Sequence, residues 1–193
     1  MFRKSKADKF ESFIAPYERG IYFTCLRILG HVQDAEDCAQ DCILKAYRSF
    51  DSFRGDSEPS TWLYRIAYNC CVDYIKKRKG VISLDALMDE GADFEDESDD
   101  ISPYLSLEES ERKRLLIEAL SELPYIFRFP VVLCDLRGID YDKAAQIMDI
   151  PLGTLKSRLN RARKKLKKIL IKNRELFLSD DSLIDERREI NEL

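Results

Sequence analysis

The spacing of apolar residues is the feature that most limits what this chain can fold into. Over residues 7–30 the apolar side chains recur every three or four positions, and the same period returns over 33–50 and 60–79. This period matches the 3.6-residue turn of an α-helix and differs from the alternation of a half-buried strand. Glycine and proline, which interrupt helices, number only 7 and 6 among 193 residues. The chain is therefore expected to be all-α.

Charge divides the chain into unlike parts. The net charge of −4 argues by itself against nucleic acid, but residues 85–100 carry nine Asp/Glu and no Lys/Arg, whereas residues 156–174 carry ten Lys/Arg and no Asp/Glu. The local pattern decides which partner a segment attracts. We expect two small helical domains joined by a flexible acidic linker. The expected order is a first domain at 1–80, the linker at 81–105, a second domain at 106–175 and a fraying C-terminal tail at 176–193.

The second domain is expected to contain a helix-turn-helix. One helix should stop at Pro124, and the next should run to about Arg137 with Pro130 causing a kink or a late start. Asp140 is expected to cap a short helix, and a turn containing Pro and Gly over residues 149–153 leads to a long helix beginning near Thr154. A short helix, a turn and a longer helix form the geometry that places the second helix in a DNA major groove.

One face of this long helix carries side chains that suit DNA. Its apolar stripe anchors it to the domain, and the opposite face is polar and basic. Arg and Lys bond guanine edges, Asn bonds adenine, and Ser bonds a base edge or a phosphate. The later cations, Arg163, Lys164, Lys165, Lys167 and Lys168, suit phosphates instead. A solvated face would mix charges of both signs, so the sequence predicts a DNA-binding helix.

The six cysteines have several interpretations. Cys38 and Cys42 lie four apart on one helix face, which suits a metal, but both fall among apolar positions of that helix. There is no C-x-x-C pair, and the single histidine is not at ligand spacing from any cysteine. Free cysteine packs as a small hydrophobe, and a reducing cytoplasm keeps it free. We therefore expect core packing, no metal and no cofactor, with a redox or metal role left open.

Other classes of protein are disfavoured. The N-terminus lacks the apolar segment of a signal peptide, and no run of 18 apolar residues exists, so we expect a cytoplasmic protein without membrane insertion. A Gly-rich phosphate loop and a nucleophile–base signature are both absent, which disfavours an enzyme. A one-component repressor with a sensing or dimerising N-terminal domain remains the alternative DNA binder. It would need a self-complementary dimer surface, and no heptad seam is evident.

Three long motifs in the same order resemble those of one protein family. The segment over residues 34–47, DAEDCAQDCILKAY, resembles region 2.2 of sigma-70 factors, and FRGD at 53–56 with TWLYRIAYN at 61–69 resembles regions 2.3 and 2.4. LP-x-x-x-R at 123–128 and IPLGTLKSRLNRAR at 150–163 match region 4. The resemblance covers about residues 8–170. Domains one and three of larger sigma factors are missing, a pattern similar to the extracytoplasmic-function (ECF) group.

The resemblance implies a transcription initiation factor and assigns roles to the polar faces. Its partners would be core RNA polymerase, through the β′ clamp helices and the β flap, promoter DNA, and a cognate anti-sigma factor, with the free protein monomeric. Core polymerase would contact Asp34, Asp37, Gln40 and Asp41. The melted −10 element would contact Arg54, Ser57, Thr61, Arg65, Asn69 and Lys76, with Trp62 as a core anchor. The duplex −35 element would contact Thr154, Lys156, Ser157, Arg158, Asn160, Arg161 and Lys164.

Overall fold

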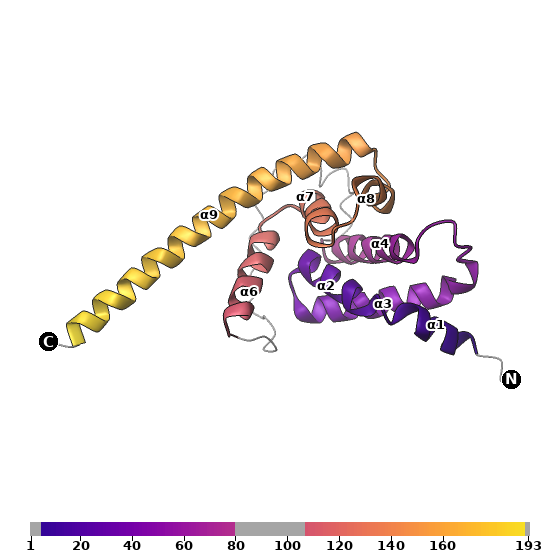
Figure 1. Cartoon of the computed structure of the whole chain (residues 1–193), viewed down its shortest axis with the longest axis horizontal. Helices are drawn as coiled ribbons and strands as arrows, with labels where there is room; N and C mark the ends of the chain where they lie inside the picture. The colour runs from indigo at the N-terminus through magenta and orange to yellow at the C-terminus, as the bar shows by residue number, and fades with distance from the viewer. Residues whose placement is uncertain (1–4, 80–106, 192–193) are drawn as a thin grey trace.

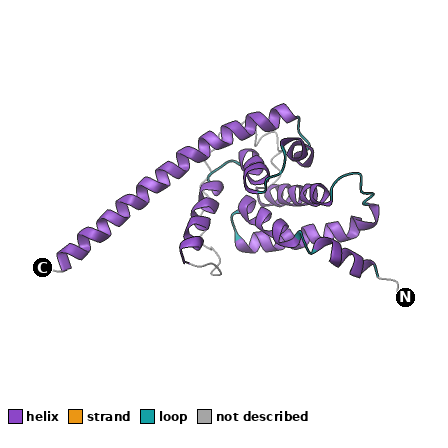
Figure 2. Ribbon diagram, in the orientation of Figure 1, coloured by secondary structure: helices purple, strands orange, loops and turns teal. Residues whose placement is uncertain are grey.

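The computed structural model describes residues 5–79 and 107–191, and within those ranges it contains helices and no strand (Figures 1 and 2). The acidic linker predicted at 81–105 lies outside the described residues. The elements are α1 Lys6–Ile14, α2 Glu18–Leu29, α3 Val32–Ser49, η1 Phe50–Ser52, α4 Pro59–Lys79, α6 Leu107–Ser121, α7 Tyr125–Pro130, η2 Val131–Leu136, α8 Tyr141–Met148 and α9 Leu152–Asn191.

The prediction of one continuous helix over residues 7–30 is wrong. The helix ends at Ile14, turns through Ala15 and Pro16, and starts again as α2. Pro16 has no backbone N–H to donate within a helix, which favours a break at this point. Gly30, where the apolar period over residues 7–30 ends, adopts the left-handed conformation, with φ of 84°, that closes a helix.

The first domain packs α2, α3 and α4 around a common core. The apolar period over residues 33–50 predicts an inward stripe of Ala35, Cys38, Ala39, Cys42, Ala46 and Phe50. The first five are buried on α3, whereas Phe50 is half-buried in η1. Small residues on this stripe let neighbouring helices approach closely. At the other end of α3, Trp62 packs against Phe53 and Phe13, with ring centroids 4.9 and 6.1 Å away, which fits its expected role as a packing anchor.

Pro130 disturbs the helix in the second domain, as expected. The α-helix α7 reaches Pro130, and the chain continues as a wider π-type turn, η2. The N–H of Arg137 then donates to the carbonyl of Val132, five residues back, at 3.1 Å. A proline supplies no N–H for the regular ladder, so a local change of helix type at this point has a direct cause. Gly138, with φ of 68°, ends the segment.

The last helix is longer than predicted. It begins at Leu152, two residues before Thr154, and extends to Asn191, past residue 175, after which we expected the chain to fray. Figure 1 shows its C-terminal part extending away from the other helices. Across the described ranges, no helix combines the length and apolar character needed to cross a membrane.

The two domains pack against each other through one contiguous core. The ring of Tyr68 in α4 lies edge-on against Phe129 in α7, with centroids 4.7 Å apart. The buried guanidinium of Arg128 donates to the carbonyl of Leu123 beside its own helix and to that of Ile28 in α2, at 2.5 Å. In Figure 1, α8 lies beside α4. This contact sets which polar faces are accessible.

Candidate nucleic-acid and partner interface

The exposed face of α9 is basic in its first turns. Leu155, Leu159 and Ala162 are buried against the domain. The side chains exposed on the other face include Lys156, Ser157, Asn160, Arg161 and Lys164, as predicted from the helical period. Thr154 is half-buried, and its carbonyl accepts a 2.9 Å hydrogen bond from the hydroxyl of Ser157. The start of α9 therefore presents amide, hydroxyl and cationic groups together.

Two arginines of α9 depart from their predicted roles. Arg158, predicted to contact DNA, is only 8% exposed. Its charge lies close enough to Tyr68 of α4 to oppose the rise in the pKa of Tyr68 that burial causes. Arg163, predicted to contact phosphate, donates to Asp135 at 3.0 and 2.5 Å and to the hydroxyl of Tyr141 at 3.0 Å. Arg163 thus holds α9 against η2 and α8.

The predicted −10 contacts are spread over the loop before α4 and along α4. Arg54 and Ser57 are exposed in the loop, and Asn69 and Lys76 are exposed on the helix. Thr61 is a correction, because it lies in the first turn of α4 with its side chain turned inward and 5% exposed. A buried threonine cannot reach DNA in this conformation.

Arg65 is exposed but engaged with the other domain. Its Nη2 donates to the backbone carbonyl of Gln146, near the C-terminal end of α8, at 2.9 Å. The carboxylate of Glu58 pairs with the ammonium of Lys143 in α8 at 2.8 Å. The first helix of the helix-turn-helix therefore covers part of the α4 surface that was assigned to DNA. Sequence patterns carry no signal for this contact.

A second contact between the domains lies at Gly20 in α2. The guanidinium of Arg137 donates to the hydroxyl of Tyr64 and sits over its ring, 5.2 Å from the centroid. A Cβ added at Gly20 would overlap that guanidinium and come within 2.7 Å of the Tyr64 hydroxyl. The absence of a side chain at Gly20 is what lets Arg137 reach this position.

The predicted polymerase-binding residues of α3 divide into two kinds. Asp37, Gln40 and Asp41 are exposed on its outer face. Asp34 instead ties α3 to α4, because it accepts a 2.5 Å hydrogen bond from the hydroxyl of Tyr74 and pairs with Arg78 at 3.0 Å. The hydrogen bond to Asp34, together with burial, raises the pKa of Tyr74 to about 12. Asp34 therefore has a structural partner in the isolated protein.

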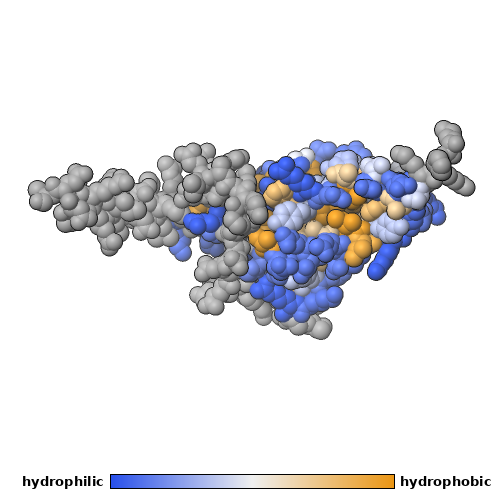
Figure 3. All heavy atoms as spheres, turned by 90° about the horizontal axis from the view of Figure 1, so that it is seen from below, coloured by the Kyte–Doolittle hydropathy of each residue, from blue (hydrophilic) through white to orange (hydrophobic). Residues whose placement is uncertain are grey.

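Sequence analysis missed Leu44 on the same helix. Its side chain is 52% exposed, one turn beyond Gln40 and Asp41. Figure 3 views the molecule from below, the side on which α1 and α3 lie in Figure 1, and shows hydrophobic atoms exposed among hydrophilic ones on this side. The signal for Leu44 was available, because a leucine at a position on the polar face of an amphipathic helix is out of pattern.

All six cysteines are buried and free, as the core-packing interpretation predicted. Three of them, Cys25, Cys38 and Cys42, have sulfur atoms within 4.8 Å of one another. Hydrogen bonds from neighbouring thiols, that of Cys25 foremost, lower the pKa of Cys38. Cys134 lies apart in η2, where burial raises the pKa of its thiol to about 11. The residues that could hold a metal are therefore in the core of the first domain.

An all-helical fold with a helix-turn-helix and a basic recognition helix defines a DNA-binding protein. Family models match two parts of the chain, Sigma-70 region 2 at residues 13–81 and Sigma-70, region 4 at residues 113–166. The chain is 34% identical to the ECF RNA polymerase sigma factor SigW of Bacillus subtilis over 172 residues, covering 87% of this chain and 92% of the relative. It is 37% identical to the ECF RNA polymerase sigma-E factor of Escherichia coli (strain K12) over 134 residues, covering 67% and 70%.

Solved structures agree with these matches. A complex of the sigma factor RpoE with the anti-sigma factor NepR from Bartonella quintana matches with a TM-score of 0.65 and 27% identity, covering 84% of this chain and 96% of that one. The fold also matches that of CnrH in complex with the cytosolic domain of CnrY, with a TM-score of 0.59, 22% identity and coverage of 83% and 86%. The chain belongs to the sigma-70 family, as an ECF sigma factor, and it directs RNA polymerase to specific promoters in transcription initiation.

Proposed function

We propose that the outer face of α3 binds core polymerase at the β′ clamp helices. Asp37, Gln40 and Asp41 form an exposed polar patch, and Leu44 adds apolar surface at its edge. An apolar contact beside polar groups is the usual composition of a protein interface. The role of Asp34 is to hold α3 and α4 in register through Tyr74 and Arg78, so that this face is presented as one surface.

The promoter is read by two separate surfaces. The observation that carries this proposal is the basic face of α9, where Lys156, Asn160 and Arg161 are exposed in the first turns of a recognition helix and would read the duplex −35 element. Arg54, Ser57 and Asn69 would contact the −10 element once it has melted. The factor performs no covalent reaction in this scheme, and it works in the cytoplasm where polymerase meets the chromosome.

The free factor must open before α4 can engage DNA. Arg65 is bonded to Gln146, and Lys143 is paired with Glu58, so α8 occupies the place that DNA would take. We infer that core polymerase and an anti-sigma factor act on this packing in opposite directions. The structural neighbour RpoE from Bartonella quintana is in complex with the anti-sigma factor NepR, which supports a cognate anti-sigma factor for this chain.

The test of this function is assembly with purified core polymerase. Asp41→Arg, on the exposed face of α3, should abolish co-elution with core polymerase in gel filtration and reduce run-off transcription from genomic fragments. Glu11→Arg makes the same change of charge at an exposed site on α1 and should leave both measurements unchanged. Equal loss in the two variants, or unchanged co-elution of Asp41→Arg, would remove α3 as the binding surface.

A further inference from the structure

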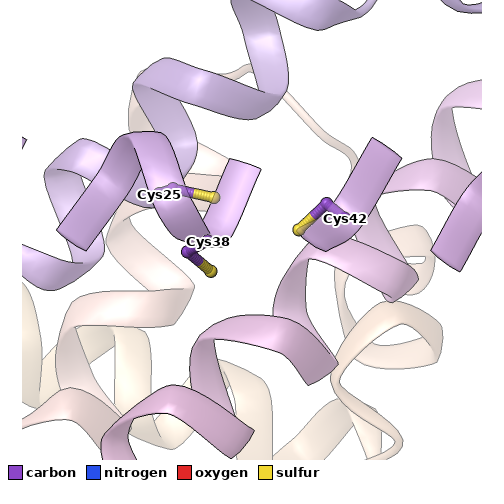
Figure 4. A group of neighbouring side chains, drawn as sticks. All are labelled: Cys25, Cys38 and Cys42. Atoms are coloured by element: carbon purple, nitrogen blue, oxygen red, sulfur yellow. The ribbon is translucent and has the colours of Figure 1, made fainter. Parts of the chain in front are cut away.

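Five of the six cysteines lie together in the core of the first domain. Cys25 belongs to α2, Cys38 and Cys42 to α3, and Cys70 and Cys71 to α4. Each is buried, with between 0 and 4% of its surface exposed. Figure 4 shows the sulfur atoms of Cys25 and Cys42 directed toward each other across the space between their helices, with Cys38 beside Cys25. Promoter binding and polymerase binding make no use of this cluster.

The spacing of four sulfur atoms approaches that of a tetrahedral metal site. The sulfur of Cys71 lies 3.7 Å from that of Cys38 and 3.8 Å from that of Cys25. Cys25, Cys38 and Cys42 have sulfur atoms within 4.8 Å of one another. A zinc ion with Zn–S bonds of about 2.3 Å in a tetrahedron requires sulfur atoms about 3.8 Å apart. Five of the six pairs among these four sulfur atoms therefore already lie within 4.8 Å, and enclosing one ion requires a side-chain movement that also brings Cys42 and Cys71 together.

The sequence positions also suit a structural zinc site. Cys38 and Cys42 have three residues between them, within the spacing found for paired zinc ligands, and one helical turn brings both to the same face. The remaining two ligands come from separate helices. Because three helices converge on the site, binding would join α2, α3 and α4 at one point.

Two simpler explanations account for less of the arrangement. Packing alone is satisfied by any small apolar residue, and it does not require thiols from three helices to converge on one point. A disulfide joins two sulfur atoms at about 2.05 Å and would leave the others unused. Cys71 is almost equally distant from Cys38 and Cys25, so the geometry selects no single pair. A tetrathiolate site uses all four sulfur atoms at once.

One cation, itself paired with a carboxylate, lies at the edge of such a site. Four thiolates and one divalent ion carry a net charge of −2, which is costly in an apolar core without compensation. Lys45, one turn beyond Cys42 on α3, lies close enough to Cys38 and Cys70 to interact with both electrostatically. Its ammonium also pairs with Asp73 at 3.1 Å, which holds it at the edge of the cluster.

We propose that Cys25, Cys38, Cys42 and Cys71 form a tetrathiolate site for one zinc ion in the core of the first domain. Binding replaces four S–H bonds with four Zn–S bonds and releases four protons to solvent, with no oxidation or reduction. Because α3 and α4 carry the surfaces for polymerase and promoter, occupancy of the site would stabilise the domain that presents them. This site is independent of the assignments made for those surfaces.

The test uses the full chain, reduced and stripped of metal with a chelator. Added zinc should bind at one ion per chain by elemental analysis and raise the melting temperature. Cobalt(II) in place of zinc should give the visible ligand-field bands and sulfur-to-metal charge transfer of a tetrahedral thiolate site. Cys38→Ala should lose the cobalt spectrum and the thermal shift, whereas Cys134→Ala, which removes a buried cysteine outside the cluster, should keep both.

Several results would overturn the proposal, and the first and the last of them are measured on wild-type protein, so they do not depend on whether a variant folds. Reduced wild-type protein that binds no zinc and shows no thermal shift would exclude the site directly. Loss of cobalt binding in Cys134→Ala to the same extent as in Cys38→Ala would place the metal elsewhere. A disulfide among the five thiols in cells, found by mass spectrometry together with absent zinc, would replace the metal site with a redox site.

Discussion

At the scale of single residues, the arginines show how far one side-chain type can vary in role. Arg128 is buried, and its charge is compensated by backbone carbonyls, including those of Leu123 and Ile28, while its guanidinium lies 4.6 Å from the ring centroid of Tyr125. Arg161 is exposed on α9. A guanidinium carries five donors in a fixed plane, so it serves equally well to join helix ends and to read a base edge.

The division of α9 into base and phosphate contacts is a prediction at this scale. Arg161→Ala should weaken binding of the holoenzyme to its promoter by about 1–3 kcal/mol, and the loss should depend on the −35 sequence. Lys168→Ala should reduce the slope of the logarithm of the binding constant against the logarithm of salt concentration by about one, and it should do so on all sequences. Both side chains are exposed on the same helix, which makes the two variants matched controls. Equal losses on every promoter for both would show that this division is wrong.

At the scale of elements, helix ends decide where the chain turns. Gly30 ends α2 with φ of 84° and lets α3 begin two residues later, which sets the packing of the two helices. Pro16 and Pro130 interrupt helices for a different reason. Each lacks the backbone N–H that would donate within a helix, so the helix breaks or changes type although the apolar period alone would continue it.

Gly30→Ala should lower the free energy of unfolding by about 1–2 kcal/mol, because an L-residue is strained in the left-handed region. The nearest atom to an added Cβ is 3.8 Å away, so the effect comes from the backbone and not from a clash. Gly153→Ala is the control, since that glycine lies in α9 with open space around it and should be neutral or slightly stabilising. Thermal unfolding measures both, and equal melting temperatures in the two variants would contradict the assignment.

At the scale of the whole molecule, the domains form one packed body, and groups that we propose to contact DNA lie where the domains meet. Arg65 was assigned to the −10 element and Arg158 to the −35 element. Both lie at or near the same junction between α4 and the helix-turn-helix. In the proposed scheme, reading two elements at once requires the domains to separate. The free energy of the contact between the domains would then limit how readily the free factor binds DNA.

Gly20→Ala should loosen this packing. A methyl group at Gly20 displaces the guanidinium of Arg137 from Tyr64, while alanine itself favours the helix by roughly 0.5–1 kcal/mol. This helix propensity offsets the shift that the Tyr64 hydroxyl, 2.7 Å from the new Cβ, must make, so the first domain should keep its stability as the molecule opens. Small-angle X-ray scattering should report a larger radius of gyration, and the free factor should bind promoter duplex more tightly. A compact variant with unchanged DNA affinity would show that Arg137 does not restrain the domains.

The sequence by itself determined the helical class, the two motifs and the exposed side of each amphipathic helix. These properties depend on residues three or four positions apart, so the helical spacing of apolar residues in the sequence is enough to predict them. The outward faces of α3 and α9 follow from it, with Asp37, Asp41 and Arg161 exposed. The burial of Cys38 and Cys42 also followed from their places among the apolar positions of α3.

Only the tertiary structure decided which of these residues meet across the chain. The burial of Thr61 and Arg158, the bond from Arg65 to Gln146 and the convergence of cysteines from three helices all join positions far apart in sequence or depend on how two elements pack. A helical period records which side of a helix is apolar, but it holds no information on the neighbour that covers that side. The compact arrangement of the domains and the zinc site that we propose both arise from such packing.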